Sequence, residues 1–241
     1  MESKFYSSIA NYYEQIFPAT DTKVDFVLQN LPKQAQRILD IGCATGELTA
    51  KISANGFMVE GIDLDPTFIK MAKQKYASDQ CSFSQMNMLD ISRHYSQEQF
   101  DGVVCLGNTL VHLKSEEEIA QLLQSIYKVL KKGGAFIFQI LNYNRILKEK
   151  PASLPLISNK NLLFERFYEY SGKYIRFSTR LSSKDLIRPL ENQQELLPVK
   201  NDELKKLLEE AGLKSVQFWG NLKMESYQEN ESFPLTGVAF K

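Results

Sequence analysis

One stretch of the 241-residue chain is well suited to bind a ligand: a loop with two glycines that follows a short apolar run. The run ends at Asp40, and residues 40–46 read DIGCATG before a segment with helical spacing begins. Glycines let a backbone approach a ligand closely, and a helix that starts beside them directs its N–H groups to the same place. The loop therefore predicts a nucleotide-like ligand.

Two classes of nucleotide fit this loop poorly. A phosphate-binding P-loop needs Lys and then Ser or Thr directly after its last glycine, but Gly46 is followed by Glu47. The dinucleotide fingerprint GxGxxG, counted from Gly42, needs glycines where Ala44 and Glu47 stand. A carboxylate would face phosphate in both cases, so a nucleoside triphosphate and a dinucleotide are both disfavoured.

The loop instead has the D-x-G-x-x-x-G form and resembles motif I of the class I S-adenosylmethionine-dependent methyltransferases. Their cofactor carries no phosphate and leaves as S-adenosylhomocysteine. The resemblance implies that Asp40 meets the ammonium end of the cofactor. It also places along the cofactor the loop residues Gly42, Cys43, Ala44 and Gly46. Many family members have glycine where this chain has Ala44.

Two further positions match this family. Asp63 ends a second apolar run, where Rossmann-like sites hold a carboxylate that accepts both ribose hydroxyls, and Leu64 follows it. Asp65 is better placed to cap a helix that begins at Pro66. After a third predicted strand, the resemblance assigns the adenine contacts to Asn87 and Met88, with Asp90 as the alternative.

Residues 105–113, CLGNTLVHL, resemble a stretch of the glycine and glycine-sarcosine N-methyltransferases. The resemblance implies that Leu106, Gly107 and Asn108 lie along the cofactor. It also places His112 near the site of methyl transfer, as a candidate general base. The alternative for His112 is a structural role, in which the ring caps or packs the end of a strand.

The N-terminus is similar to the FYxxxAxxYD start of many small-molecule methyltransferases, with Phe5-Tyr6, Ala10 and Tyr13-Glu14 at the matching positions. This implies that Tyr6 and Tyr13 approach the cofactor. Tyr13 is then expected beside the transferred methyl group, as a wall or a hydrogen-bond donor. Residues 141–147, LNYNRIL, resemble the NYDxIL segment of the glycine N-methyltransferases.

Alternating strands and helices must position these residues. Strand patterns occupy residues 38–41, 57–62, 82–88, 100–106 and 135–141, and helical patterns lie between them at 45–54, 66–78 and 115–131. Ser115 and Glu118 form a capping box, and Lys132-Gly133-Gly134 is expected to stop that last helix. Residues 1–31 also have helical spacing. The alternation predicts βαβ units around a parallel sheet.

The pattern changes after residue 150. Aromatic and polar residues alternate at 162–170 and 174–182 around a turn at 171–173, and a third extended piece covers 190–199. A helix at 201–211 and strands at 214–219 and 235–240 follow. The fold class is therefore α/β: a Rossmann-like, doubly wound, mostly parallel seven-stranded sheet with an antiparallel insertion before the last helix. By resemblance, its strand order is 3-2-1-4-5-7-6.

Three regions are expected from this organisation. Residues 1–149 form N-terminal helices and the cofactor-binding core, residues 150–200 form a substrate cap, and residues 201–241 complete the core sheet. The cap is also a candidate homodimer surface. Its arginines could orient an anionic substrate or serve as exposed strand residues; they are Arg166, Arg176 and Arg180.

Composition limits the remaining classes. The chain has 29 basic and 29 acidic side chains, so it lacks the overall basic charge typical of nucleic-acid binding. Three cysteines without CxxC spacing, and a polar N-terminus unlike a signal peptide, predict free thiols in a cytoplasmic protein. The longest apolar stretch is too short to cross a membrane. With only His94 and His112 and no carboxylate cluster, no metal site is expected.

These observations predict methyl transfer from S-adenosylmethionine to a nitrogen or oxygen of a small molecule. Two alternatives stay open at this point. One is a protein that binds the cofactor without catalysis, as a sensor. The other is an RNA or protein methyltransferase, although the (N/D/S)PP(Y/F) motif of the N6-adenine and N4-cytosine enzymes is absent after the fourth strand.

Overall fold

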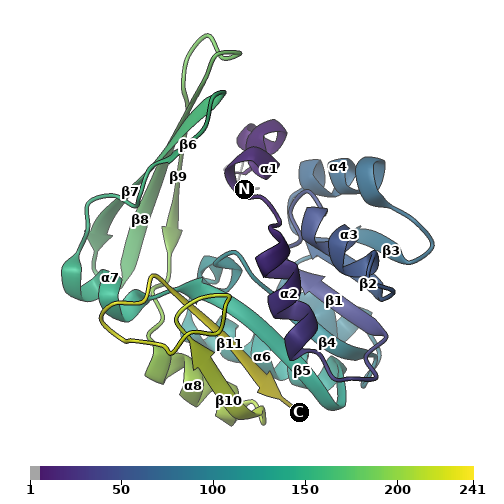
Figure 1. The fold of residues 1–241 in the computed structure, drawn as a ribbon. Helices are drawn as coiled ribbons and strands as arrows, with labels where there is room; N and C mark the ends of the chain where they lie inside the picture. The colour runs from purple at the N-terminus through teal and green to yellow at the C-terminus, as the bar shows by residue number, and fades with distance from the viewer. Residues whose placement is uncertain (1–5) are drawn as a thin grey trace.

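A computed structural model describes residues 6–241, so the predicted contribution of Phe5 lies outside the described residues. Its main sheet has seven strands in the order β3-β2-β1-β4-β5-β11-β10 (Figure 1). Only β11 runs antiparallel to its neighbours β5 and β10. Counted within this sheet, the order is the predicted 3-2-1-4-5-7-6. The strands are β1 (Arg37–Ile41), β2 (Met58–Asp63), β3 (Cys81–Gln85), β4 (Phe100–Cys105), β5 (Leu130–Leu141), β10 (Lys214–Trp219) and β11 (Pro234–Phe240).

Alternating side chains of the buried strands pack into two separate clusters, one on each face of the sheet. Ile38 belongs to the cluster that contains Phe26 and Ile52, whereas its neighbour Leu39 belongs to the cluster that contains Ile126. One face is therefore covered by α2 and α3, and the other by α6 and α8. The longer helices are α2 (Asp21–Asn30), α3 (Glu47–Ser53), α4 (Pro66–Tyr76), α6 (Glu116–Val129) and α8 (Asn201–Glu210).

Two helix caps follow the sequence signals. The Asp65 carboxylate accepts hydrogen bonds from the backbone N–H groups of Thr67 at 2.7 Å and Phe68 at 3.4 Å, so Asp65 caps α4 as predicted. The Ser115 hydroxyl accepts from the N–H of Glu118 at 3.3 Å. The Glu118 carboxylate, however, accepts from the N–H of Lys114, one residue before the position that a capping box requires.

Some predicted boundaries were wrong. The helix α6 ends at Val129, and β5 begins directly at Leu130, which pairs with Phe100 of β4. The pair Gly133-Gly134 therefore lies within a strand and does not stop a helix. Near the N-terminus, the helical pattern is split into η1 (Ser7–Tyr12), α1 (Tyr13–Ile16) and α2, because Pro18 interrupts it.

The short helices after the strands were not predicted. They form where the chain leaves the carboxyl edge of the sheet. Each is too short for its apolar residues to show a helical repeat. The third strand also ends earlier than expected, at Gln85, because Asn87 caps the first of these helices. They are η2 (Met88–Asp90), α5 (Ile91–His94), η3 (Thr109–His112) and α7 (Tyr143–Glu149).

The predicted insertion forms a second, antiparallel sheet that projects from the main sheet (Figure 1). Along β7, Phe164 and Tyr168 are buried while Leu163 and Phe167 are exposed, as the alternation predicted. This sheet belongs to the cap, residues 150–200. Its inner face shares a hydrophobic cluster with β5. The cap therefore packs onto the core. Its strands are β6 (Ile157–Ser158), β7 (Leu162–Ser171), β8 (Tyr174–Ser183) and β9 (Leu190–Leu196).

The three cysteines are free thiols and all are buried. Within residues 6–241, no helix has both the length and the apolar character that a membrane span requires.

Candidate active site

The glycine loop crosses the carboxyl ends of β1 and β2 in a conformation that its two glycines make accessible. Gly42 and Gly46 have φ of +74° and +85°, in the left-handed region. A Cβ atom on Gly42 would lie 2.6 Å from Cγ2 of Thr109, and one on Gly46 would lie 2.7 Å from the Phe83 ring. Both positions therefore require glycine for space as well as for backbone angle.

Asp63 at the end of β2 holds this loop in place. Its carboxylate accepts hydrogen bonds from the backbone N–H of Ala44 at 3.0 Å and from that of Asp65 at 2.9 Å. Burial raises the pKa of Asp63 to about 6, against the opposing effect of these hydrogen bonds. Ala44 itself has φ of +48°, which explains why glycine suits this position in similar loops.

Asp40 is a buried carboxylate without a positive partner. Its side chain is 2% exposed and accepts one hydrogen bond, from the Thr49 hydroxyl at 2.7 Å. Burial raises the pKa of Asp40 to about 6, and the negative charge of Asp63 adds to the shift. A cationic ligand group beside Asp40 would offset this desolvation.

We expect Asp40→Asn to stabilise the protein in the absence of ligand. The folded pKa of about 6 exceeds the unfolded value of ~3.9, so ionisation of Asp40 lowers stability as pH rises from ~4 to ~6. Asparagine removes this penalty and can still accept from Thr49. Urea unfolding should show a gain on the order of 1–3 kcal/mol at pH 7 and little gain near pH 4. An equal gain at both pH values would contradict this origin.

A cavity of about 260 Å³ opens where the glycine loop, the N-terminal segment and the cap meet. Ten of the residues predicted from the sequence line it, which brings the first strand, the fourth strand and the N-terminus to one place. These ten residues are Asp40, Gly42, Cys43, Ala44, Leu106, Gly107, Asn108, His112, Tyr6 and Tyr13.

The remaining predicted residues lie beside the cavity, around the ends of β2 and β3. These two strand ends are joined, because the N–H of Met86 donates to the carbonyl of Asp63 at 2.9 Å. Gly46 packs against Phe83 at the start of α3. Beyond the strand ends, Leu64 is 60% exposed, Asn87 is exposed and Met88 is partly buried.

The side chains of Asn87 and Asn108 are committed to the protein itself. The Asn87 side chain accepts from the N–H of Leu89 at 3.0 Å. The Asn108 amide donates to the Tyr143 hydroxyl at 3.0 Å, and its oxygen accepts from the N–H of Leu141 at 2.9 Å. Asn108 thus fixes the turn after β4 through β5 and α7. Its predicted part in orienting a cofactor would be exerted through this turn.

His112 joins the N-terminal segment to the cap. Its Nε2 lies 3.1 Å from the hydroxyl oxygen of Tyr6, and that oxygen accepts a bond from the Gln194 amide at 3.4 Å. We assign the Tyr6 hydroxyl as the donor to Nε2, which places the ring proton on Nδ1. Burial lowers the pKa of His112 to about 4, so the ring is neutral at physiological pH.

Tyr13 completes the wall next to Tyr6. Its ring meets Tyr6 edge-on at a centroid separation of 6.3 Å and Phe68 at 4.8 Å. Burial raises the pKa of Tyr13 well above its usual value. The hydroxyl is therefore protonated at physiological pH and can serve as a hydrogen-bond donor.

The cap contributes a cavity wall that the sequence analysis did not assign residue by residue. Its members lie at alternate positions on the inner face of β7 and β8, so period-two spacing was the available signal. The wall also receives Phe233 from the loop before β11, for which no sequence signal existed. The cap residues are Phe164, Arg166, Tyr168 and Phe177.

The three cap arginines differ in their partners. Arg176 pairs with Glu169 at 2.8 Å, and Arg180 lies 3.6 Å from Glu191. Arg166 donates to the carbonyl of Pro155 at 2.7 Å, but its buried Nε has no partner. Among the residues from 6 onwards, no carboxylate lies within ion-pair distance of Arg166, and burial lowers the pKa of its guanidinium.

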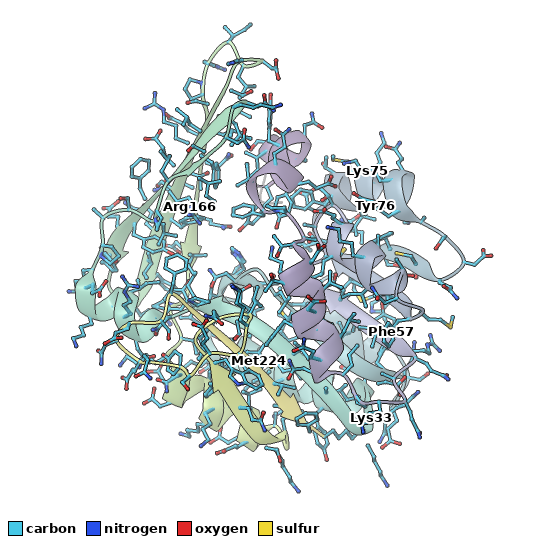
Figure 2. All side chains as sticks on the ribbon, in the orientation of Figure 1. Lys33, Phe57, Lys75, Tyr76, Arg166 and Met224 are labelled. Carbon is cyan, nitrogen blue, oxygen red and sulfur yellow. The ribbon has the colours of Figure 1, made fainter. Side chains whose placement is uncertain are left out.

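Arg166 lies on the cap, away from the residues of the core that Figure 2 labels. Figure 2 shows it on the cap, with Lys75 and Tyr76 of α4 on the other side of the N-terminal segment. Of the two histidines, only His112 lies in the cavity, while His94 is exposed and its Nδ1 contacts the Asp90 carbonyl. Across the described chain, no group of three or more His, Cys, Asp or Glu side chains could hold a metal ion.

The residues present fit the chemistry of S-adenosylmethionine. Asp40 offers an uncompensated carboxylate for an ammonium group, and Asp63 offers carboxylate oxygens for ribose hydroxyls. Leu64 offers exposed apolar surface for a purine. Glu47, at the first turn of α3, accepts from the N–H of Ala19, so a carboxylate already occupies the helix end that a phosphate would need.

Comparison with known proteins supports this assignment. Residues 38–134 match the family model described as a methyltransferase domain. The putative methyltransferase YqeM of Bacillus subtilis is 31% identical over 151 residues, which are 61% of this chain and 60% of that protein. The glycine/sarcosine N-methyltransferase of Aphanothece halophytica is 27% identical over 87% of this chain and 78% of its own length.

A solved structure shows the same fold. The S-adenosylmethionine-dependent methyltransferase of Clostridium acetobutylicum superposes with a TM-score of 0.80 at 17% identity, over 98% of both chains. The family match identifies residues 38–134 as a methyltransferase domain, and the superposition shows that the chain has the fold of this S-adenosylmethionine-dependent enzyme. The chain spans less than two thirds of YqeM, so this relative does not define its whole activity.

Proposed function

We propose that this protein transfers the methyl group of S-adenosylmethionine to a nitrogen atom of a small-molecule acceptor. One observation carries the proposal: the glycine loop and Asp40 line the same cavity as His112, Tyr13 and the cap. Cofactor and acceptor could therefore meet in one cavity. A sensor that only binds the cofactor would have no need of the second, cap-lined half.

The lowered pKa and the engaged Nε2 of His112 favour nitrogen over oxygen as the acceptor atom. When bound, the sulfonium of S-adenosylmethionine supplies an activated methyl group, so the protein has to align the acceptor with it. A neutral amine can attack without losing a proton first, whereas a hydroxyl needs a base whose pKa is near the working pH. His112, with its pKa lowered to about 4 and its Nε2 engaged by Tyr6, is a poor base for that purpose.

The cap favours an acceptor that also carries an acid. Arg166 is a cation without an acidic partner, and it lines the cavity on the side of Tyr168. A guanidinium binds a carboxylate through two parallel hydrogen bonds and so fixes its orientation. The name of the Aphanothece halophytica relative, glycine/sarcosine N-methyltransferase, supports an amino acid as the acceptor. We propose that the cap, residues 150–200, selects the acceptor in this way.

The proposal predicts a preference for amines over matched alcohols. With labelled cofactor, glycine should be methylated at least ~100-fold faster than glycolate, because no efficient base is available for the hydroxyl. At saturating S-adenosylmethionine, the kcat/KM for an amine should rise with pH through the pKa of that amine, with no separate limb near pH 6–7. Methylation of glycolate at a similar rate, or a limb at pH 6–7 for every acceptor, would contradict nitrogen transfer.

A further inference from the structure

A second cavity, of about 530 Å³, lies at the base of the cap. The helix α7, residues 151–156 and part of β7 form its walls, and Phe233 closes one side. Its volume falls within the range of pockets that hold small molecules. Apart from Arg166, the proposed methyl transfer to an amine does not require the residues of this space.

The second cavity gathers three of the eight large apolar side chains that are exposed among the described residues. Leu156, Phe167 and Phe233 are 56%, 40% and 41% exposed, and all three line this cavity. Four charged residues also line this cavity: Arg145 and Glu149 form an ion pair of 3.0 Å, and Glu165 and Arg166 are neighbours along β7. Exposed apolar side chains gathered in one concave site are typical of a binding site for an apolar group.

The two cavities meet at three side chains. Leu154, Arg166 and Phe233 line both of them. Arg166 thus stands at the junction, with His112 and the glycine loop on one side and the apolar walls of the second cavity on the other. A ligand whose acid is held by Arg166 would have its remaining carbon chain directed to one cavity or the other.

We propose that the natural acceptor is an elongated amino acid whose apolar chain occupies the second cavity. Its carboxylate pairs with Arg166 and its amine lies on the side of His112. This inference rests on the proposed function for the amine, but the binding of the acid and its chain is independent of methyl transfer. A long chain also explains the exposed Leu156, Phe167 and Phe233, which glycine would leave in contact with water.

Calorimetry with straight-chain carboxylates, from acetate to decanoate, tests the cavity in the intact protein without turnover. Affinity should rise by up to about fourfold per methylene until the cavity is filled. Leu156→Trp, which occupies the cavity, should abolish this rise and leave acetate binding unchanged. Leu163→Trp, at an exposed position of β7 that lines neither cavity, is the matched control and should behave as the parent protein. A flat dependence on chain length in the parent would overturn the proposal.

A second pair of variants tests the junction. Arg166→Gln should weaken every carboxylate at least ~10-fold, whereas Arg166→Lys, which keeps the charge, should weaken them less. Thermal unfolding of both variants shows whether each is folded. If affinity grows with chain length but Arg166→Gln has no effect, the acid is misplaced and the proposed orientation fails.

Turnover separates this inference from the proposed function. The parent protein should methylate 2-aminooctanoate with a higher kcat/KM than glycine, and Leu156→Trp should reverse the order. Methylation of glycine and 2-aminooctanoate at equal kcat/KM would refute the second cavity and keep the methyl transfer. Length-dependent carboxylate binding without methylation of any amine would refute the proposed function and keep the cavity.

Discussion

Replacement of Asp63 by alanine is expected to weaken the binding of S-adenosylmethionine about 10- to 150-fold. We propose that the carboxylate binds the ribose hydroxyls, and a charge-assisted hydrogen bond of that kind contributes roughly 1.5–3 kcal/mol. The substitution also removes the acceptor of the Ala44 N–H, which holds the glycine loop at 3.0 Å. Calorimetry of the variant against the parent protein measures the loss.

The control for this variant is Asp79→Ala, which removes an exposed carboxylate near the start of β3 and should leave the affinity unchanged. Asp63→Asn separates charge from shape, because asparagine fills the same space and keeps one acceptor. It should retain part of the affinity that alanine loses. Unchanged binding in Asp63→Ala would remove Asp63 from the ribose site.

The raised pKa of Asp63 adds a dependence on pH to the same measurement. Only the ionised carboxylate accepts two hydroxyls, and its pKa is about 6, so binding should strengthen as pH rises from 5 to 7 and then level off. Asp40, with the same pKa, contributes to this rise through the ammonium group. The double variant Asp40→Asn, Asp63→Asn should show no such rise, although its affinity is lower at every pH.

The central strands of the main sheet could be predicted because they are buried on both faces and bounded by a turn or a cap. The short apolar runs at Ile38 and Val103 fit few structures other than a buried strand. Asp65 and Ser115 mark the starts of helices. The end of α6 could not be predicted, since the pairing of Leu130 with Phe100 decides it. That contact is between strands, and it overrides the glycines at 133–134.

The site was predictable where a motif names the residue and unpredictable where the fold brings distant segments together. The glycine loop and His112 belong to contiguous stretches, and the structure brings them into one cavity. The sequence offered three cap arginines with similar spacing. Only the structure shows that Arg176 and Arg180 have acidic partners, whereas Arg166 does not. Phe233 comes from an irregular loop and carries no periodicity.

The proposed role of His112 also changed in character once its neighbours were known. The sequence allowed a general base or a packed ring. In the structure, the Tyr6 hydroxyl occupies Nε2 and is in turn bonded to Gln194 of β9, and burial lowers the pKa of the ring to about 4. These two hydrogen bonds tie the N-terminal segment, the core and the cap together at the cavity. We therefore infer that His112 acts mainly by positioning the acceptor wall.

His112→Ala is accordingly expected to lower kcat about 10- to 100-fold with little change in cofactor affinity, because alignment supplies most of the rate and is only partly lost. Tyr6→Phe should cause a loss of similar size, and the double variant should lose little more, since both residues act through one hydrogen bond. His94→Ala, at the exposed histidine, is the control and should match the parent. A loss beyond ~10⁴ would establish obligatory base catalysis by His112. A loss below about twofold would leave the ring with a packing role alone.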